Sequence, residues 1–140
     1  MAKIWQKEFT QESIEARNSN TLATHLDMRI EEIGDDFLTI SMPVDETTHQ
    51  PMGLLHGGAS VALAETVGSI ASNVAAPDGY FCVGMEINAN HVKAIRSGRV
   101  FGTARPIHLG KTSHVWEIKI TNNQQQLICI SRLTMAVRKA

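Results

Sequence analysis

The stretch that decides the fold runs from His49 to Pro77 and reads HQPMGLLHGGASVALAETVGSIASNVAAP. Small and apolar residues from Gly58 to Ala76 predict one continuous helix, and the only charged residue within it is Glu65. At about 100° per residue, one side of this helix forms a narrow apolar stripe, which we expect to face a sheet. The stripe consists of Leu63, Val67, Ile70 and Val74.

The opposite side of the predicted helix carries mostly small residues. Small side chains let another backbone approach closely, so we expect this side to be covered as well. A helix without a solvated charged face is buried nearly all round. The residues on this side are Gly58, Val61, Glu65, Gly68, Ser69 and Ser72.

Strand-like runs surround this helix. The segment 10–25 has the polarity of short surface helices, with Thr10 as an N-cap. Short connections join the last three runs, which predicts an antiparallel meander. The class is therefore α+β: one long helix laid against a curved antiparallel sheet of about five or six strands, in a single domain over residues 1–140. The expected strands cover residues 28–33, 37–44, 80–93, 99–108, 114–121 and 127–138.

Composition excludes several classes of function. A net charge of -1 and a pI near 6.6 argue against binding to nucleic acid. The N-terminal residues MAKIWQKEFT do not resemble a signal peptide, and no uncharged stretch is suited to a membrane span, so we expect a cytoplasmic protein. Cys82 and Cys129 lie in apolar runs outside any C-x-x-C pair, which predicts buried, reduced thiols.

Motifs for several chemistries are absent from the sequence. The six histidines form no H-x-H, H-E-x-x-H or Cys/His cluster, so we expect no metal. The sequence contains no G-x-S-x-G elbow, no G-x-G-x-x-G and no P-loop, and we expect no cofactor.

Two features at the helix suggest chemistry on a carbonyl group. Glu65 has no basic residue at i±3 or i±4, and a covered carboxylate without a basic partner can take or give protons. Gly57 stands at the helix start, where free backbone N–H groups can hold a carbonyl oxygen. The alternatives are a solvated Glu65 and a His56-Gly57-Gly58 segment that only makes a tight turn.

Distance separates these two groups along one helix. Gly57 and Glu65 are eight residues apart, which is about 12 Å at a rise of 1.5 Å per residue. A carbonyl held by one and attacked by the other must lie within roughly 3–4 Å of both. We therefore expect two helices packed antiparallel across a two-fold axis, which gives a dimer with two composite sites.

Three segments together resemble the hotdog-fold acyl-CoA thioesterases of the 4-hydroxybenzoyl-CoA and phenylacetate-pathway type. They are HQPMGLLHGGASVALAETVGS, VGMEINANHVKAIRSG and LGKTSHVWEIKI. The resemblance covers nearly the whole chain and extends to members acting on 1,4-dihydroxy-2-naphthoyl-CoA in menaquinone synthesis and members proofreading an aryl carrier protein. It implies hydrolysis of aromatic acyl-CoA, with carrier-protein thioesters as further substrates. It also implies a hotdog fold, in which the sheet wraps the long central helix. Two subunits would join their sheets edge to edge in a homodimer, or in a tetramer built as a dimer of dimers.

The resemblance implies roles for individual residues. Glu65 would be the nucleophile or the general base that activates water, and Ser69 would help to place that water. Gly57 N–H and the Gln50 amide would hold the thioester oxygen, while His56 would orient the substrate or assist the departing thiolate. The residues implied for the coenzyme A arm are Gly84, His91, Val92 and Lys93, and those for its phosphates are Lys111, Thr112 and Ser113.

Two other functions are open from the residues. One is a hydratase or dehydratase acting on an acyl thioester, in which a carboxylate and a histidine transfer protons. The other is a non-enzymatic module that binds acyl-CoA. Release of free thiol separates hydrolysis from hydration, and retained turnover after Glu65→Gln would argue against the catalytic role of Glu65.

Overall fold

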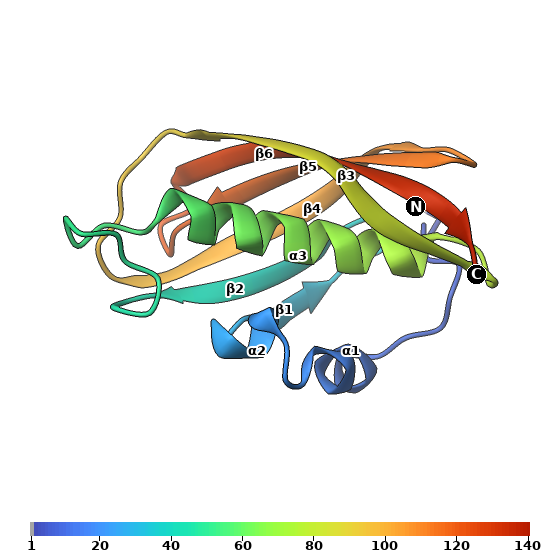
Figure 1. Ribbon diagram of the computed structural model, residues 1–140, viewed down its shortest axis with the longest axis horizontal. Helices are drawn as coiled ribbons and strands as arrows, with labels where there is room; N and C mark the ends of the chain where they lie inside the picture. The colour runs from blue at the N-terminus through green and yellow to red at the C-terminus, as the bar shows by residue number, and fades with distance from the viewer. Residues whose placement is uncertain (1) are drawn as a thin grey trace.

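The computed structural model describes residues 2–140, which form one six-stranded sheet and three helices (Figure 1). The strands pair in the order β1-β2-β4-β5-β6-β3, and every neighbouring pair is antiparallel. The elements are α1 (Gln11–Asn18), α2 (Leu22–His25), β1 (Arg29–Ile33), β2 (Leu38–Val44), α3 (Gly57–Ala75), β3 (Tyr80–His91), β4 (Gly98–Leu109), β5 (Ser113–Thr121) and β6 (Leu127–Lys139).

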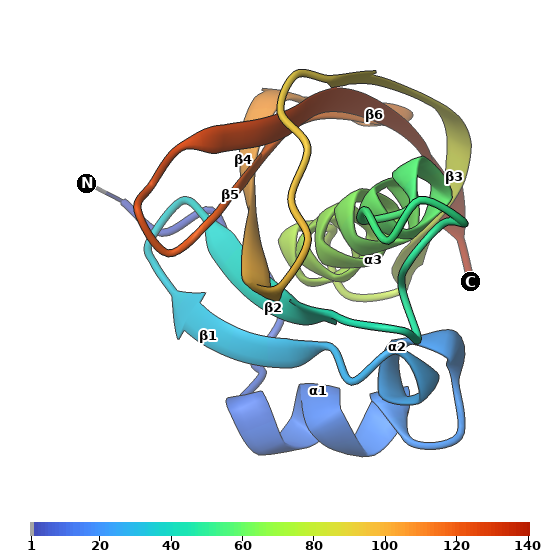
Figure 2. The same ribbon diagram turned by 90° about the vertical axis from the view of Figure 1, so that its left-hand side faces the viewer.

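The sheet curves around α3, as the view along the helix shows (Figure 2). Alternating burial along β5, where every second residue is inaccessible, gives the sheet one apolar face for the helix to cover. The short helices α1 and α2 lie outside this wrap, beside β1 (Figure 2). Thr10 caps α1 and accepts from the Ser13 N–H, as the sequence predicts. The predicted α+β architecture is confirmed.

The meander of the last three strands is confirmed, but β3 lies outside it. β3 pairs with β6 at one edge of the sheet, and β2 pairs with β4. A strand's place in a sheet depends on which partner completes the core, so local sequence leaves it open. The arrangement leaves a twelve-residue strand, β3, with one side unpaired.

The predicted faces of α3 need one correction. Leu63 and Val67 face the sheet as expected, but Gly68 and Ser72 are buried on that side, while Ile70 and Val74 are only half-buried. A Cβ atom on Gly68 would lie 2.5 Å from Leu133 Cδ2, so glycine lets α3 approach β6 closely. The small residues thus serve the helix–sheet contact as well as the outer side.

A polar contact lies inside the core near the C-terminal end of α3. Ser72 Oγ and His114 Nδ1 are 2.6 Å apart, and the Cys82 thiol donates to the Ser72 carbonyl at 3.5 Å. Burial lowers the pKa of His114 and raises the pKa of Cys82. Cys82 and Cys129 are both buried free thiols, as predicted.

Within residues 2–140, no helix has the length and apolar character needed to cross a bilayer.

Candidate active site

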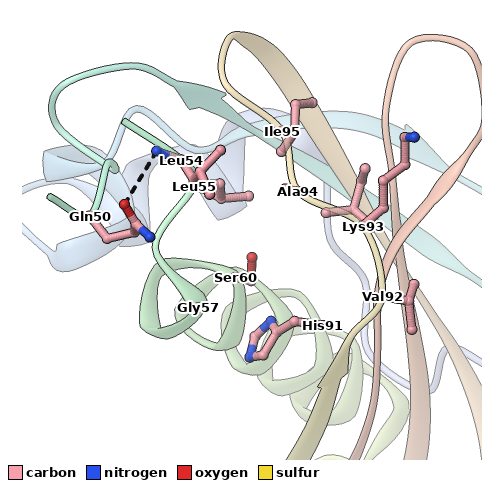
Figure 3. Close-up of a pocket in the computed structure, with 11 residues that line it drawn as sticks. Gln50, Leu54, Leu55, Gly57, Ser60, His91, Val92, Lys93, Ala94 and Ile95 are labelled. Carbon is pink, nitrogen blue, oxygen red and sulfur yellow. Dashed lines mark hydrogen bonds between the residues drawn. The ribbon is translucent and has the colours of Figure 1, made fainter. Parts of the chain in front are cut away.

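Gln50 lies in the loop between β2 and α3, and the loop fixes the orientation of its side chain. Gln50 Oε1 accepts from the backbone N–H groups of Met52 and Leu54, the second at 3.4 Å. With the oxygen held by the loop, the amide NH2 group turns toward the start of α3 (Figure 3). Gln50 therefore presents a hydrogen-bond donor at that point, as a carbonyl oxygen requires.

The start of α3 presents a second donor. His56 is the N-cap, and its Nδ1 accepts from the Gly58 N–H at 2.8 Å. This bond leaves Nε2 as the protonated ring nitrogen, on an exposed side chain. Gly57 is the first residue of the helix, where a backbone N–H has no intrahelical acceptor. His56 thus supports the helix terminus that aims the Gly57 N–H.

His91, the last residue of β3, packs on Gly57. A Cβ atom at residue 57 would stand 3.0 Å from His91 Nε2 and 3.2 Å from its Cε1. Glycine therefore lets the imidazole lie close against the helix start, where a larger residue would press on the ring. The contact joins the end of the edge strand to the terminus of α3 (Figure 3).

These groups meet at a cavity of about 340 Å³. Its wall combines apolar side chains from the loops and β6 with polar groups near the helix start, as is typical of ligand sites. Five of the predicted residues line it: Gln50, Gly57, His91, Val92 and Lys93. The remaining residues that line the cavity are Leu54, Leu55, Ser60, Ala94, Ile95 and Ile128.

Ser60 is a cavity residue that sequence reasoning missed. It is 2% exposed, and its hydroxyl points into the cavity between Leu55 and Ala94 (Figure 3). Ser60 follows Gly57 by three residues, so it lies on the same side of the helix nearly one turn further. That spacing was the available signal.

Glu65 and Ser69 lie in a different pocket, of about 300 Å³. Residues 18 and 21–23 of the α1–α2 region form its other wall. Glu65 is half-buried, and none of the ion pairs found within residues 2–140 involves it. The carboxylate lies over Gly84, because a Cβ atom built there would overlap Glu65 Oε2. Gly84 thus makes room for the acid, and it does not line the cavity that holds His91.

The predicted phosphate-binding residues are remote from both pockets. Lys111 and Thr112 form the β4–β5 turn, and Ser113 begins β5. This turn lies by the C-terminal end of α3, where Lys111 lines a pocket with Ala75 and Pro77 (Figure 1). Within one chain, the carbonyl donors, the acid and this turn occupy three separate places along the helix.

In one chain, the groups that could act on a carbonyl are therefore divided between two pockets. Two donors, from Gln50 and Gly57, converge at the cavity where a carbonyl oxygen can be held. The free carboxylate stands two turns further along α3, in its own pocket. Together these groups are suited to acyl transfer from a thioester.

Comparisons with known proteins agree with this assignment. Residues 52–129 match the family described as the Thioesterase superfamily. The chain is 48% identical over 134 residues to the 1,4-dihydroxy-2-naphthoyl-CoA hydrolase of Escherichia coli K12, covering 96% of this chain and 98% of that protein. Identity and coverage are the same for the proofreading thioesterase EntH of Cronobacter turicensis. The chain belongs to the thioesterase superfamily.

The structural comparison gives the same class. A crystal structure of a thioesterase from Haemophilus influenzae matches with a TM-score of 0.95 and 46% identity, covering 97% of this chain and 95% of that one. The predicted hotdog fold is confirmed, and the protein is an enzyme that hydrolyses thioesters.

Proposed function

We propose that this enzyme hydrolyses aromatic acyl-CoA thioesters, of which 1,4-dihydroxy-2-naphthoyl-CoA in menaquinone synthesis is one, in the cytoplasm and without a cofactor. The observation that carries the proposal is the convergence of the Gln50 amide and the Gly57 N–H at one partly apolar cavity. The name of the Escherichia coli relative, a 1,4-dihydroxy-2-naphthoyl-CoA hydrolase, supports an aryl thioester of coenzyme A. Thioesters of a carrier protein are the further substrates that the family resemblance implies.

The two donors act on the thioester oxygen. As the carbonyl carbon is attacked, negative charge gathers on this oxygen, and a fixed donor stabilises it by ~3–4 kcal/mol. His91 and Val92, on the cavity wall, hold the arm that leads to the sulfur, and Lys93 lies beside them. His56 Nε2–H is free to donate toward the departing thiolate.

Glu65 supplies the attack, either as a nucleophile or by taking a proton from water that Ser69 helps to place. Because Gly57 and Glu65 line different pockets in one chain, the acid must come from a second copy. Each composite site then combines Gln50 and Gly57 of one subunit with Glu65 of the partner subunit.

The edge strand β3 supports this dimer. It is twelve residues long, and Val83 and Met85 on it are 46% and 65% exposed, whereas β1 at the other edge has five residues, most of them charged. A long apolar edge is a surface for pairing with another strand. Antiparallel pairing of two β3 strands sets the Tyr80 end of one beside the His91 end of the other. It also carries Lys111–Ser113 of the partner subunit toward this chain's cavity, where those residues meet the coenzyme A phosphates.

A thiol-release assay tests the function. Aromatic and aliphatic acyl-CoA substrates are compared by kcat/KM, with a thiol-reactive dye reporting free coenzyme A. We expect the aromatic substrates to lead, and Glu65→Gln to bind substrate but lose turnover. No thiol release from any substrate, or full turnover by Glu65→Gln, would contradict the proposal. A hydratase would convert its substrate without releasing thiol.

A further inference from the structure

The loop that carries Gln50 is anchored at its base inside the protein. Thr48 is 2% exposed, and its hydroxyl donates to the Pro43 carbonyl at 2.9 Å. The His56 N–H donates to the Thr48 carbonyl at 2.8 Å, which closes the loop just before α3 begins. The two ends of the loop are therefore fixed to each other and to the end of β2.

The middle of the loop is attached to a distant segment, the Ile95–Arg96 stretch between β3 and β4. His49 Nε2 lies 2.8 Å from the Arg96 carbonyl oxygen, and the Leu55 N–H donates to the Ile95 carbonyl at 2.9 Å. Arg96 Nη1 returns a bond to the Met52 carbonyl at 3.2 Å. Because a carbonyl only accepts, His49 Nε2 must carry the proton of its bond.

The position of His49 gives these bonds a consequence for catalysis. His49 directly precedes Gln50, and the bridge between His49 and Leu55 frames the turn whose amides hold Gln50 Oε1. Pro51 and Met52 at the tip are exposed and bury little surface that could hold the turn in place. The orientation of the Gln50 amide thus depends on hydrogen bonds. Of the three bonds between the loop and the Ile95–Arg96 stretch, the His49 bond is the one made by a side chain of the loop.

We infer that His49 is a positioning residue: by bonding the Arg96 carbonyl, it fixes the Gln50 amide against the start of α3. The inference rests on the proposed function, since Gln50 acts there as a carbonyl donor. The Ile95–Arg96 stretch also follows Val92 and Lys93, which line the cavity. One segment therefore lines the substrate cavity and holds the loop that bears the donor.

The test compares His49→Leu with His49→Gln. Leucine removes the donor, and glutamine places an amide N–H close to the position of the lost Nε2. Losing an oxyanion donor outright costs about 10²–10³ in kcat, so misplacing Gln50 in His49→Leu should cost about 10-fold in kcat with little change in KM. His49→Gln should recover to within about 3-fold of wild type, and the exposed His25→Leu should behave as wild type.

Repeating His49→Leu in a Gln50→Ala protein separates a positioning effect on Gln50 from a general loss of structure. If His49 acts through Gln50, His49→Leu should cost less than about 2-fold when Gln50 is already alanine. Hydrogen exchange gives a readout that needs no turnover: the Met52 and Leu54 amides should exchange faster in His49→Leu and at the wild-type rate in His49→Gln. If His49→Leu fails to fold, His49→Asn, whose amide is too short to reach, replaces it.

The outcomes are distinct. Unchanged kcat and unchanged exchange in His49→Leu overturn the inference, as does an equal loss of kcat in the Gln50→Ala background. A wild-type protein that releases no thiol from any substrate overturns the proposed function instead. The exchange measurement then still decides whether His49 holds the loop.

Discussion

The Glu65 carboxylate lies directly over Gly84 of β3, in the space that any side chain at residue 84 would take. The helix thus carries an acid, and the edge strand carries the gap that receives it. Register shifts between Gly84 and Glu86, so a β-bulge stands beside this gap on the strand that we expect to form the dimer. The position of the Glu65 carboxylate therefore depends on the edge strand β3.

Gly84→Ala should therefore impair catalysis more than stability. The new methyl group meets the flexible end of Glu65, which can swing aside, so the free energy of unfolding should change by less than about 1 kcal/mol. The displaced carboxylate should lower kcat by about 10-fold or more, because removing a general base costs about 10²–10⁴. Steady-state kinetics and urea unfolding measure the two effects. Adding Gly84→Ala to Glu65→Gln should cost nothing further in kcat, and a large extra loss would contradict the account.

A second prediction concerns the exposed apolar edge of β3, where we expect two subunits to pair. Met85→Lys should weaken the dimer, because the substitution removes apolar surface at the paired edge and sets like charges near each other across the two-fold axis. Light scattering should then show a monomer at concentrations where wild type is dimeric, and specific activity should fall on dilution. Ile33→Lys, on the opposite edge strand β1, is the matched control and should remain dimeric. A fully active monomer would contradict the composite site.

A third prediction concerns acid stability. Burial, with a smaller effect from His108, lowers the pKa of His114 below its usual 6.5, and the groups bonded or close to its ring are Ser72 and Cys82. Below pH 6.5 the unfolded chain takes up a proton at this residue before the folded chain does, so the free energy of unfolding should fall as pH drops.

The measurement is the change in Tm between about pH 7.5 and about pH 5.5. His114→Gln keeps a polar group opposite Ser72 but does not titrate, so its Tm should depend less on pH than that of wild type. The exposed His25→Gln should keep the wild-type slope. An equal slope in all three proteins would show that another group governs acid stability.

Much of the fold follows from local sequence. The six predicted strands agree with the observed ones to within two residues at each end, and α3 begins one residue earlier than predicted, because His56 supplies a side-chain cap. The pairing of β3 with β6 could not be predicted, because the partner of a strand depends on the packing of the whole core and not on local sequence. The faces of α3 were partly misassigned because Gly68 was interpreted as an outward small residue, whereas it lies under Leu133.

The candidate site follows from sequence to a smaller extent. The family resemblance marked Gln50, Gly57 and His91, and they line one cavity in the structure. Ser60 was missed because its three-residue spacing from Gly57 indicates only a shared side of the helix and does not show that a cavity lies there. The hydrogen bond between His49 and the Arg96 carbonyl joins residues 47 positions apart, and no pattern in the sequence connects them. The assignment of catalytic roles remains a prediction.

Mixing two inactive variants tests the composite site most directly. Gln50→Ala lacks a carbonyl donor and Glu65→Gln lacks the acid, so each homodimer should be nearly inactive. Equal amounts refolded together give one half heterodimers, and each has one intact site, so activity should recover to about a quarter of wild type. No recovery above the sum of the two parents, with heterodimers verified by mass spectrometry, would contradict a site shared between two chains.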